Sequence, residues 1–225
     1  MKVYSLPPQI QGLIFDLDST LYENPAYAQN QVEAQIELLA KRWGRNPSEL
    51  QLEIYQREEA WTRAHQGRKP SFGNLLHDAY GISIQESVKI REEAICPERW
   101  LYSDSKLKAV LQKLQSKYRM VLLTNNPTSI GRRSLRALGV EECFSAVVGL
   151  ETTLKSKPSP ETFQEALRIL ELPANRVVSV GDRYSVDIEP ALKLGMGGIL
   201  VEGLEDTYSL DWILLEKSSS EPSSP

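Results

Sequence analysis

The chain has 225 residues, of which 41% are hydrophobic and 25% charged, and this balance excludes a disordered, collagen-like or coiled-coil chain. Its formal net charge of −4 argues against a protein that grips a long phosphate backbone. Two cysteines and two histidines leave little material for a disulfide framework or a histidine-rich metal centre. Because no stretch approaches the roughly 18 apolar residues of a membrane-spanning helix, we expect a cytoplasmic protein that binds neither nucleic acid polymers nor membranes.

The first predicted strand, residues 13–16, is followed by a long interval in which no strand pattern stands out. Most of this interval has helical periodicity, as in the apolar stripe formed by Val32, Ile36 and Leu39. A helical segment of this size between two strands is typical of an inserted domain. We therefore predict that residues 22–101 form a helical cap domain.

The second half of the chain contains further short apolar runs that predict strands. Continuous apolar character is typical of parallel strands that are covered on both faces. These runs lie at residues 120–124, 144–148, 177–180 and 198–201. Helical patterns separate them, which favours a doubly wound, Rossmann-like α/β fold with a parallel sheet. We expect residues 1–21 and 102–216 to form this core domain, and residues 217–225 to form a disordered tail.

Two carboxylates, Asp16 and Asp18, end the first predicted strand. Residues two apart on an extended chain point to the same side, so these two carboxylates repel each other. A divalent cation or a shared proton would relieve that repulsion. Two solvated acids at the end of a strand are the plainer alternative.

Polar residues also follow the second predicted strand and precede a later helix. Thr124 and Asn125 come directly after an apolar run, in a loop before a helix start where an anion is favoured. Lys157 stands before a proline and upstream of a helix expected to begin near Pro160, so it can reach across the strand ends. Taken singly, these are an ordinary turn and a surface lysine.

The fourth strand leads into a third group of candidate residues. Gly181 permits a sharp turn that leaves Asp182 at the strand tip, and Asp187 opens a helix whose dipole favours an acid. The carboxyl ends of parallel strands meet in one crevice, where ligands bind in open α/β sheets. Hard oxygen ligands with few histidines point to Mg²⁺ rather than zinc.

Together these segments resemble the four motifs of the haloacid dehalogenase (HAD) superfamily. The first motif is similar to residues 15–22, Phe-Asp-Leu-Asp-Ser-Thr-Leu-Tyr, and the second to Thr124 after its apolar run. The third is similar to the stretch that starts with Lys157-Pro158, and the fourth to residues 181–187. The resemblance covers residues 10–203 and implies a Rossmann-like core with a helical cap.

The resemblance implies a role for each candidate in catalysis. Asp16 would be the nucleophile that forms an aspartyl-phosphate, and Asp18 the general acid and base. Lys157 would offset the negative charge of Asp16 and of the phosphoryl group.

It also implies binding roles. Thr124 and the backbone of Asn125 would bind the phosphoryl group. Mg²⁺ would be the cofactor, and Asp18 would contribute its main-chain carbonyl. The implied metal ligands are Asp16, Asp18, Asp182 and Asp187.

The implied activity is Mg²⁺-dependent hydrolysis of a small phosphomonoester, either a nucleoside monophosphate or a sugar phosphate. The second carboxylate at Asp18 argues against a dehalogenase, and no cap lysine is singled out as a phosphonatase would require. A phosphomutase and a non-catalytic phosphate-binding relative remain as alternatives. The residues of the first motif, together with the stretch at residues 75–81, favour the pyrimidine 5′-nucleotidase-like branch. We expect a monomer or homodimer whose partner is a small phosphorylated metabolite.

Overall fold

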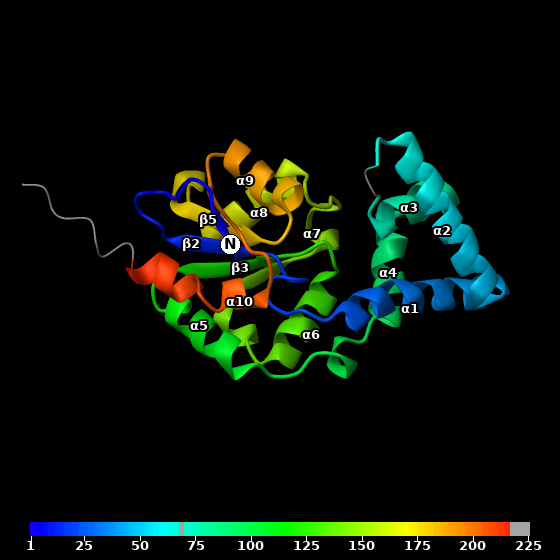
Figure 1. Cartoon of the computed structure of the whole chain (residues 1–225), viewed down its shortest axis with the longest axis horizontal. Helices are drawn as coiled ribbons and strands as arrows, with labels where there is room; N and C mark the ends of the chain where they lie inside the picture. The colour runs from blue at the N-terminus through cyan, green and yellow to red at the C-terminus, as the bar shows by residue number, and fades with distance from the viewer. Residues whose placement is uncertain (68–69, 217–225) are drawn as a thin grey trace, which may run out of the picture. The chain divides into compact units, whose positions relative to one another are not determined.

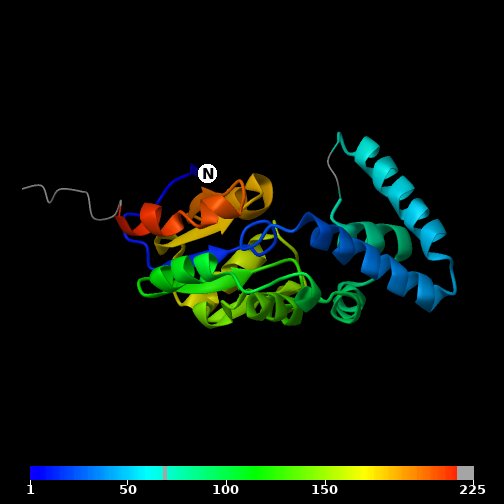
Figure 2. The same cartoon turned by 60° about the horizontal axis from the view of Figure 1, so that its bottom comes forward.

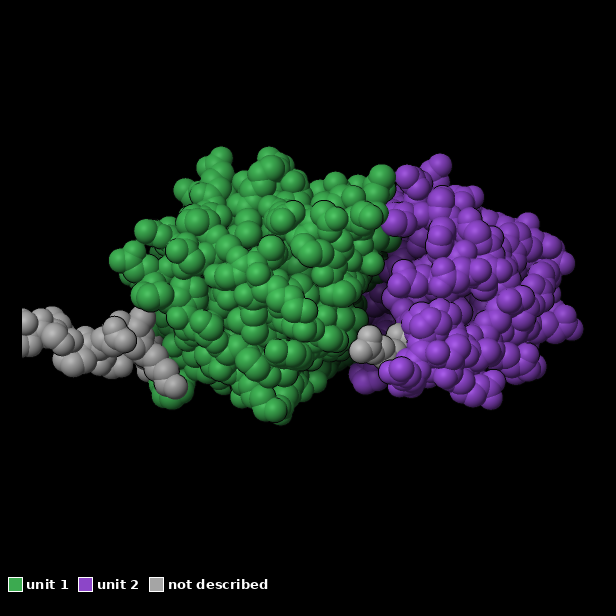
Figure 3. Space-filling model, turned by 90° about the horizontal axis from the view of Figure 1, so that it is seen from above, with its two compact units in different colours: residues 1–24, 97–225 green, residues 25–96 purple. Residues whose placement is uncertain are grey.

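The computed structural model describes residues 1–67 and 70–216, so the predicted tail at 217–225 lies outside the described residues. The chain divides into two compact units, coloured separately in Figure 3. Unit 1 comprises Met1–Asn24 and the chain from Pro97 onward, and unit 2 comprises Pro25–Cys96. Unit 2 is therefore narrower at both ends than the predicted cap at 22–101. At the boundary between the units, the Asn24 side chain donates to the Trp100 carbonyl at 3.0 Å, and both residues belong to unit 1.

The described part of unit 1 is built on a six-stranded sheet with the order β1-β6-β5-β2-β3-β4. The strands are β1 (Lys2–Val3), β2 (Gly12–Phe15), β3 (Arg119–Leu123), β4 (Ala146–Val148), β5 (Val177–Gly181) and β6 (Gly197–Leu200). All neighbouring pairs from β6 to β4 are parallel, which confirms the predicted doubly wound α/β fold. The edge strand β1 pairs antiparallel with β6 and was not predicted, because its two residues are exposed and show no apolar run.

Helices cover both faces of this sheet. They are α5 (Ser105–Gln115), α6 (Thr128–Leu138), α7 (Leu150–Thr153), α8 (Pro160–Leu170), α9 (Glu189–Lys193) and α10 (Leu204–Thr207). Figure 1 shows α8 and α9 on one side of the sheet and α5 and α6 on the other. On the first side, Phe163 and Ala166 of α8 pack with Ile14 and Val121 of the central strands, all at most 1% exposed. Burying a large apolar side chain stabilises a fold by about 1.5–3 kcal/mol, so this two-sided cover explains the continuous apolar runs.

Unit 2 is helical, and Figure 2 shows its two long N-terminal helices, in blue and cyan, along their length. They are α1 (Pro25–Trp43), α2 (Pro47–Ala64), α3 (Phe72–Tyr80) and α4 (Ile84–Ala94). Their shared core is a cluster of buried aliphatic side chains: Ile36, Leu39, Ala40, Leu50, Ile54, Leu75, Leu76, Ile82 and Ile90. Side-chain caps define the helix starts, because Asn46 accepts from the first turn of α2 and Ser83 forms a capping box with Glu86. Among the described residues of the chain, no helix is both long and apolar enough to span a membrane.

Candidate active site

The site lies at the carboxyl ends of three neighbouring strands. β2 pairs in register with β3 on one side and with β5 on the other. The Asp16 amide donates to the Val180 carbonyl at 2.9 Å and extends the ladder by one residue. The residues that follow the three strands therefore meet at one edge of the sheet, as expected for parallel strands. They include Asp16, Thr124 and Asp182.

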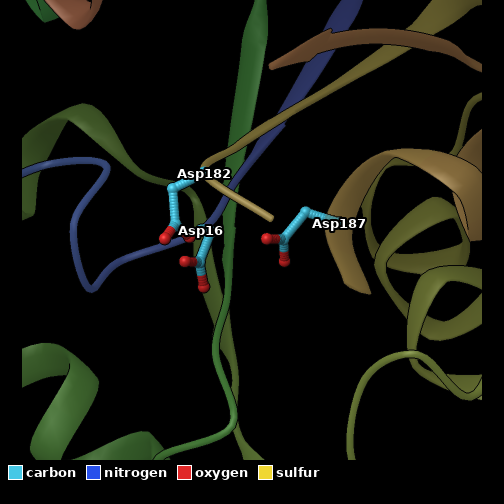
Figure 4. A group of neighbouring side chains, drawn as sticks. All are labelled: Asp16, Asp182 and Asp187. Carbon is cyan, nitrogen blue, oxygen red and sulfur yellow. The ribbon is translucent and has the colours of Figure 1, made fainter. Parts of the chain in front are cut away.

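Three carboxylates converge at this edge. Oxygens of Asp16, Asp182 and Asp187 all lie within 4.8 Å of one another, and Figure 4 shows the three side chains directed toward a common point. Asp187 comes from η4 (Tyr184–Ile188), a single π-helical turn, and not from the start of an α-helix as predicted. A Cβ on Gly181 would lie 2.5 Å from the Asp187 Cβ, so glycine is required here for space rather than for turn geometry.

The Lys157 ammonium links two of these carboxylates. Its Nζ donates to Asp16 Oδ1 at 2.5 Å and to Asp187 Oδ1 at 2.6 Å, and all three side chains are at most 2% exposed. Burial by itself favours the neutral amine, but the charges of Asp16 and Asp187 outweigh it and raise the pKa of Lys157. The lysine is therefore a permanent cation within the site.

The backbone of Lys157 is held in turn by Asn125. The Asn125 Nδ2 donates to the Lys157 carbonyl at 3.2 Å, and the Lys157 amide donates to Asn125 Oδ1 at 2.7 Å. The sequence reading assigned the backbone of Asn125 to phosphoryl binding and did not foresee these contacts of its side chain.

Even with Lys157 in place, the cluster is short of positive charge. Asp16 Oδ2 and Asp182 Oδ1 are buried and have no hydrogen-bond partner among the described residues. Burial and the nearby charge of Asp16 raise the pKa of Asp182 to about 6. The Arg183 guanidinium, half exposed, lies 3.6 Å from Asp182 and 3.9 Å from Asp187. Arg183 was missed in the sequence, although it directly follows the fourth motif.

These residues fit a hard divalent cation. The donors are carboxylate oxygens only, and Asp16 Oδ2 and Asp182 Oδ1 are buried without a hydrogen-bond partner among the described residues. Carboxylate oxygens are the ligands that Mg²⁺ and Ca²⁺ prefer, whereas zinc sites favour histidine and cysteine. Asp16 and Asp182 are the residues able to ligate such an ion directly, with Asp187 beside them.

The Asp18 carboxylate lies outside this cluster and has its own partners. The Tyr22 hydroxyl donates to Asp18 Oδ1, and Asn126 Nδ2 donates to Asp18 Oδ2 at 3.1 Å. Both oxygens of the carboxylate therefore have a donor within unit 1. Tyr22 and Asn126 were missed as site residues, and the available signal was their position within or directly beside the first two motifs.

The loop after β3 brings further polar groups to the site. Thr124 is 2% exposed, and its Oγ1 accepts from the Asn126 amide at 3.1 Å, so the hydroxyl proton stays available to a ligand. The start of α6, predicted as an anion position, carries an anion from the chain itself. The Glu151 carboxylate accepts from the Thr128 amide at 2.9 and 3.1 Å. The Thr128 amide is therefore already bonded within the chain.

Comparisons with known proteins agree with this geometry. The sequence profile of the haloacid dehalogenase-like hydrolases matches residues 10–195. The chain is 23% identical over 209 residues to human N-acylneuraminate-9-phosphatase, covering 84% of this chain and 80% of that protein. It is 26% identical over 219 residues to ribulose-1,5-bisphosphate 5-phosphatase of Halopiger xanaduensis, covering 87% of this chain and 86% of that protein.

The fold comparison points the same way. A crystal structure of a HAD phosphatase from Thermococcus onnurineus matches with a TM-score of 0.65 and 19% identity, covering 92% of this chain and 98% of the other. At this identity the likeness shows the fold alone, while the family profile spans most of the chain. The resemblance stated from the motifs is thereby confirmed. This protein is an enzyme of the haloacid dehalogenase-like hydrolase family.

Proposed function

We propose that the protein is a Mg²⁺-dependent phosphatase that hydrolyses small phosphomonoesters through an aspartyl-phosphate on Asp16. The observation that carries this proposal is the state of the Asp16 carboxylate. One of its oxygens accepts from the buried Lys157 ammonium, and the other is buried without a hydrogen-bond partner in the described residues. A carboxylate with one oxygen held by a hydrogen bond and the other oxygen available for attack is suited to act as a nucleophile.

In the proposed first step, an Asp16 oxygen attacks phosphorus and the ester P–O bond breaks. The leaving oxygen takes a proton from the Asp18 carboxyl group, which acts as general acid. In the second step, Asp18 takes a proton from water, and the water oxygen attacks phosphorus. The acyl-phosphate P–O bond then breaks, which releases inorganic phosphate and restores the Asp16 carboxylate.

The positioned charges support this assignment of roles. An anionic nucleophile must approach an anionic phosphate, so cations have to surround both of them. Lys157 supplies one fixed cation beside Asp16. Thr124, whose hydroxyl proton stays available, is proposed to donate to a phosphoryl oxygen, together with the backbone of Asn125.

Asp16 and Asp182, supported by Asp187 and the Asp18 main-chain carbonyl, would hold the metal ion. When bound, Mg²⁺ supplies positive charge that screens the carboxylates and the transferring phosphoryl group. Burial and the charge of Asp16 raise the pKa of Asp182 to about 6, and a cation beside the carboxylate would favour its charged form.

We propose phosphorylated sugars or sugar acids as the favoured substrate class. The two relatives described above are named for substrates of that kind, and each match spans more than four fifths of this chain. A nucleoside monophosphate is the second candidate, and the nucleotidase-like branch stays a prediction. The chain would then act on a small phosphorylated metabolite as a monomer or homodimer.

A panel of phosphate esters tests this function. Purified protein is incubated with sugar phosphates, sugar-acid phosphates, nucleoside monophosphates and a phosphopeptide, each with and without Mg²⁺, and released phosphate is measured. We expect phosphate release only with the metal, and a higher kcat/KM for a sugar phosphate than for the phosphopeptide. Isomerised sugar phosphate without phosphate release would identify a phosphomutase. No turnover of any ester, with Asp16 intact, would contradict the proposal.

A further inference from the structure

The Asn125 side chain bonds to the backbone of Lys157. The carboxamide spans both main-chain groups of one residue, because it accepts from the Lys157 amide at 2.7 Å and donates to the Lys157 carbonyl at 3.2 Å. This pattern also fixes which end of the amide is oxygen, since the opposite assignment would face two donors and two acceptors against each other. Asn125 follows β3 by two residues, so the clamp anchors Lys157 to the end of a central strand.

Lys157 needs such an anchor because it lies in an irregular segment. Helix α7 ends at Thr153 and α8 begins at Pro160, so no helix or strand sets the backbone of the lysine. The side chain must nevertheless place one ammonium group between Asp16 and Asp187 at 2.5 and 2.6 Å. A buried charge that loses its partners costs several kcal/mol, so the position of this backbone matters for the ion pairs.

We infer that Asn125 is a positioning residue for Lys157: its carboxamide holds the lysine backbone so that the ammonium faces Asp16. The catalytic part of this inference rests on the phosphatase function proposed above. It concerns the side chain of Asn125, whereas the role assigned from the motifs is a contact of the Asn125 backbone with the phosphoryl group. A direct contact of the side chain with the phosphoryl group would act in the absence of Lys157, whereas a positioning role does not.

A double-variant cycle with Asn125→Ala and Lys157→Ala separates the two roles. A displacement of a catalytic group by about 1 Å can cost about 100-fold in rate, so we expect Asn125→Ala to lower kcat by about 10- to 100-fold. In the Lys157→Ala background, the same change should alter kcat by less than about two-fold, because the group to be positioned is gone. Losses that multiply, or a raised KM with unchanged kcat, would overturn the inference.

Protein stability provides a second readout, which tests whether the Asn125 bonds act on the backbone of residue 157. The Asn125 bonds end on the main chain of residue 157, which persists when the lysine side chain is removed. Asn125→Ala should therefore still lower Tm in the Lys157→Ala background, and should lower it further in the wild-type background, where the buried ion pairs of Lys157 are weakened as well. A rate effect that disappears with Lys157→Ala, beside a stability effect that persists, is the expected signature. A Tm effect that vanishes with Lys157→Ala would show that the clamp does not act on the backbone.

A crystal structure of the Asn125→Ala variant tests the position of the Lys157 ammonium without an activity measurement. We expect the Lys157 Nζ to leave hydrogen-bond distance of Asp16 or Asp187, and unchanged contacts to both would overturn the inference. If no phosphate ester is hydrolysed, the proposed function fails while this structural test still stands. Asn125→Ser serves if the alanine variant does not fold, because the shorter side chain cannot span both main-chain groups.

Thr153→Ala is the matched control. The Thr153 hydroxyl donates to the Lys155 carbonyl at 3.3 Å, another bond from a side chain to the main chain at this segment. Because Lys155 is exposed, we expect kcat within about two-fold of wild type. A loss as large as that of Asn125→Ala would mean that any loosening of the segment is enough, and the specific role of Asn125 would fall.

Discussion

The two units of the chain differ in their buried charges, because the buried charged side chains of the described residues are Asp16, Lys157 and Asp187, all in unit 1. In unit 1, the ion pairs of Lys157 with Asp16 and Asp187 have side chains at most 2% exposed. In unit 2, the pair of Arg45 with Glu53 has side chains 35% and 30% exposed, and other pairs of that unit are more open still. Unit 1 also has exposed pairs, such as Lys106 with Glu205, so the buried cluster is what distinguishes it from unit 2.

The buried charges of unit 1 indicate that the functional site of the described chain lies in this unit. Removing a charge from water costs several kcal/mol, so buried ionic groups often mark functional sites, although structural networks exist. Exposed pairs contribute at most about 1 kcal/mol and carry little functional signal. Substitutions of the buried charged residues of unit 1 should therefore change the rate, and those of the exposed charged residues of unit 2 should only slightly change the stability.

The largest effect is expected from Asp16→Asn. The amide keeps the shape of the carboxylate but cannot form an acyl-phosphate, so kcat should fall by at least about 10⁴-fold, as for other lost nucleophiles. Steady-state kinetics measure the loss, and near-ultraviolet circular dichroism checks that the fold is intact. A folded variant with kcat within ten-fold of wild type would place the nucleophile elsewhere.

Removal of the metal should come next. Treatment with a chelator should lower kcat by about 10³-fold or more, because a bound cation contributes several kcal/mol to such transition states. Added Mg²⁺ should restore the rate, and chelator saturated with Mg²⁺ beforehand is the control. Undiminished turnover in metal-free buffer would refute a metal held by Asp16 and Asp182.

Two lysines in one segment test the placement of the third motif. Lys157→Ala should lower kcat by about 10²- to 10³-fold, the usual loss when a charge-stabilising donor is removed from an active site. Lys155→Ala should leave kcat within about two-fold, because this residue is exposed. Equal losses for the two variants would mean that the burial of Lys157 is not what matters.

In unit 2, substitutions in the apolar core should lower the free energy of unfolding more than substitutions of charged residues. Ile54 is fully buried, so Ile54→Ala should lower the free energy of unfolding by about 2–5 kcal/mol. Leu52 on the same helix is 60% exposed, and Leu52→Ala should change it by no more than about 0.5 kcal/mol. Chemical denaturation followed by circular dichroism measures both. Equal effects would show that the helical core is not packed as described.

The smallest effect is expected from Glu53→Gln. Hydrogen bonds from Arg45, Tyr80 and Arg57 lower the pKa of Glu53 from 4.5 to about 2. The folded state therefore binds fewer protons than the unfolded state between these values, and stability rises with pH there. The contribution is present above about pH 4.5 and is lost as pH falls toward 2.

Because the Glu53 side chain is 30% exposed, solvent screening should limit its contribution at pH 7 to less than about 1 kcal/mol. Denaturation of wild type and Glu53→Gln at pH 7 and at pH 2–3 checks this, with Glu37→Gln, an exposed residue of α1, as control. A difference that grows as pH falls would have the wrong sign.

Much of unit 1 was predictable from local patterns. The continuous apolar runs predicted all five parallel strands, since strands covered on both faces have no polar side. The acids and the lysine at 16, 157 and 182 could be proposed together, because the carboxyl ends of parallel strands share one edge. The fold that results was confirmed.

Other features had no local signal. The two-residue strand β1 is exposed, so no apolar run announced it. The motifs place Tyr22, Asn125 and Asn126 near the site, but nothing in the neighbouring sequence predicts which groups their side chains bond. Glu151, which accepts from the Thr128 amide, is likewise one acid among many on the surface of helices.

The sequence by itself determined the fold class, the edge of the sheet where the site lies, and the residue types at that edge. It did so because hydrophobic periodicity depends on short segments of chain, and because the carboxyl ends of parallel strands share one edge. Only the tertiary structure decided the use of each group: that Lys157 joins Asp16 to Asp187, and that one oxygen of Asp16 has no hydrogen-bond partner among the described residues. Hydrogen bonds over 30 to 141 residues of sequence depend on how whole elements pack, and no local pattern encodes them.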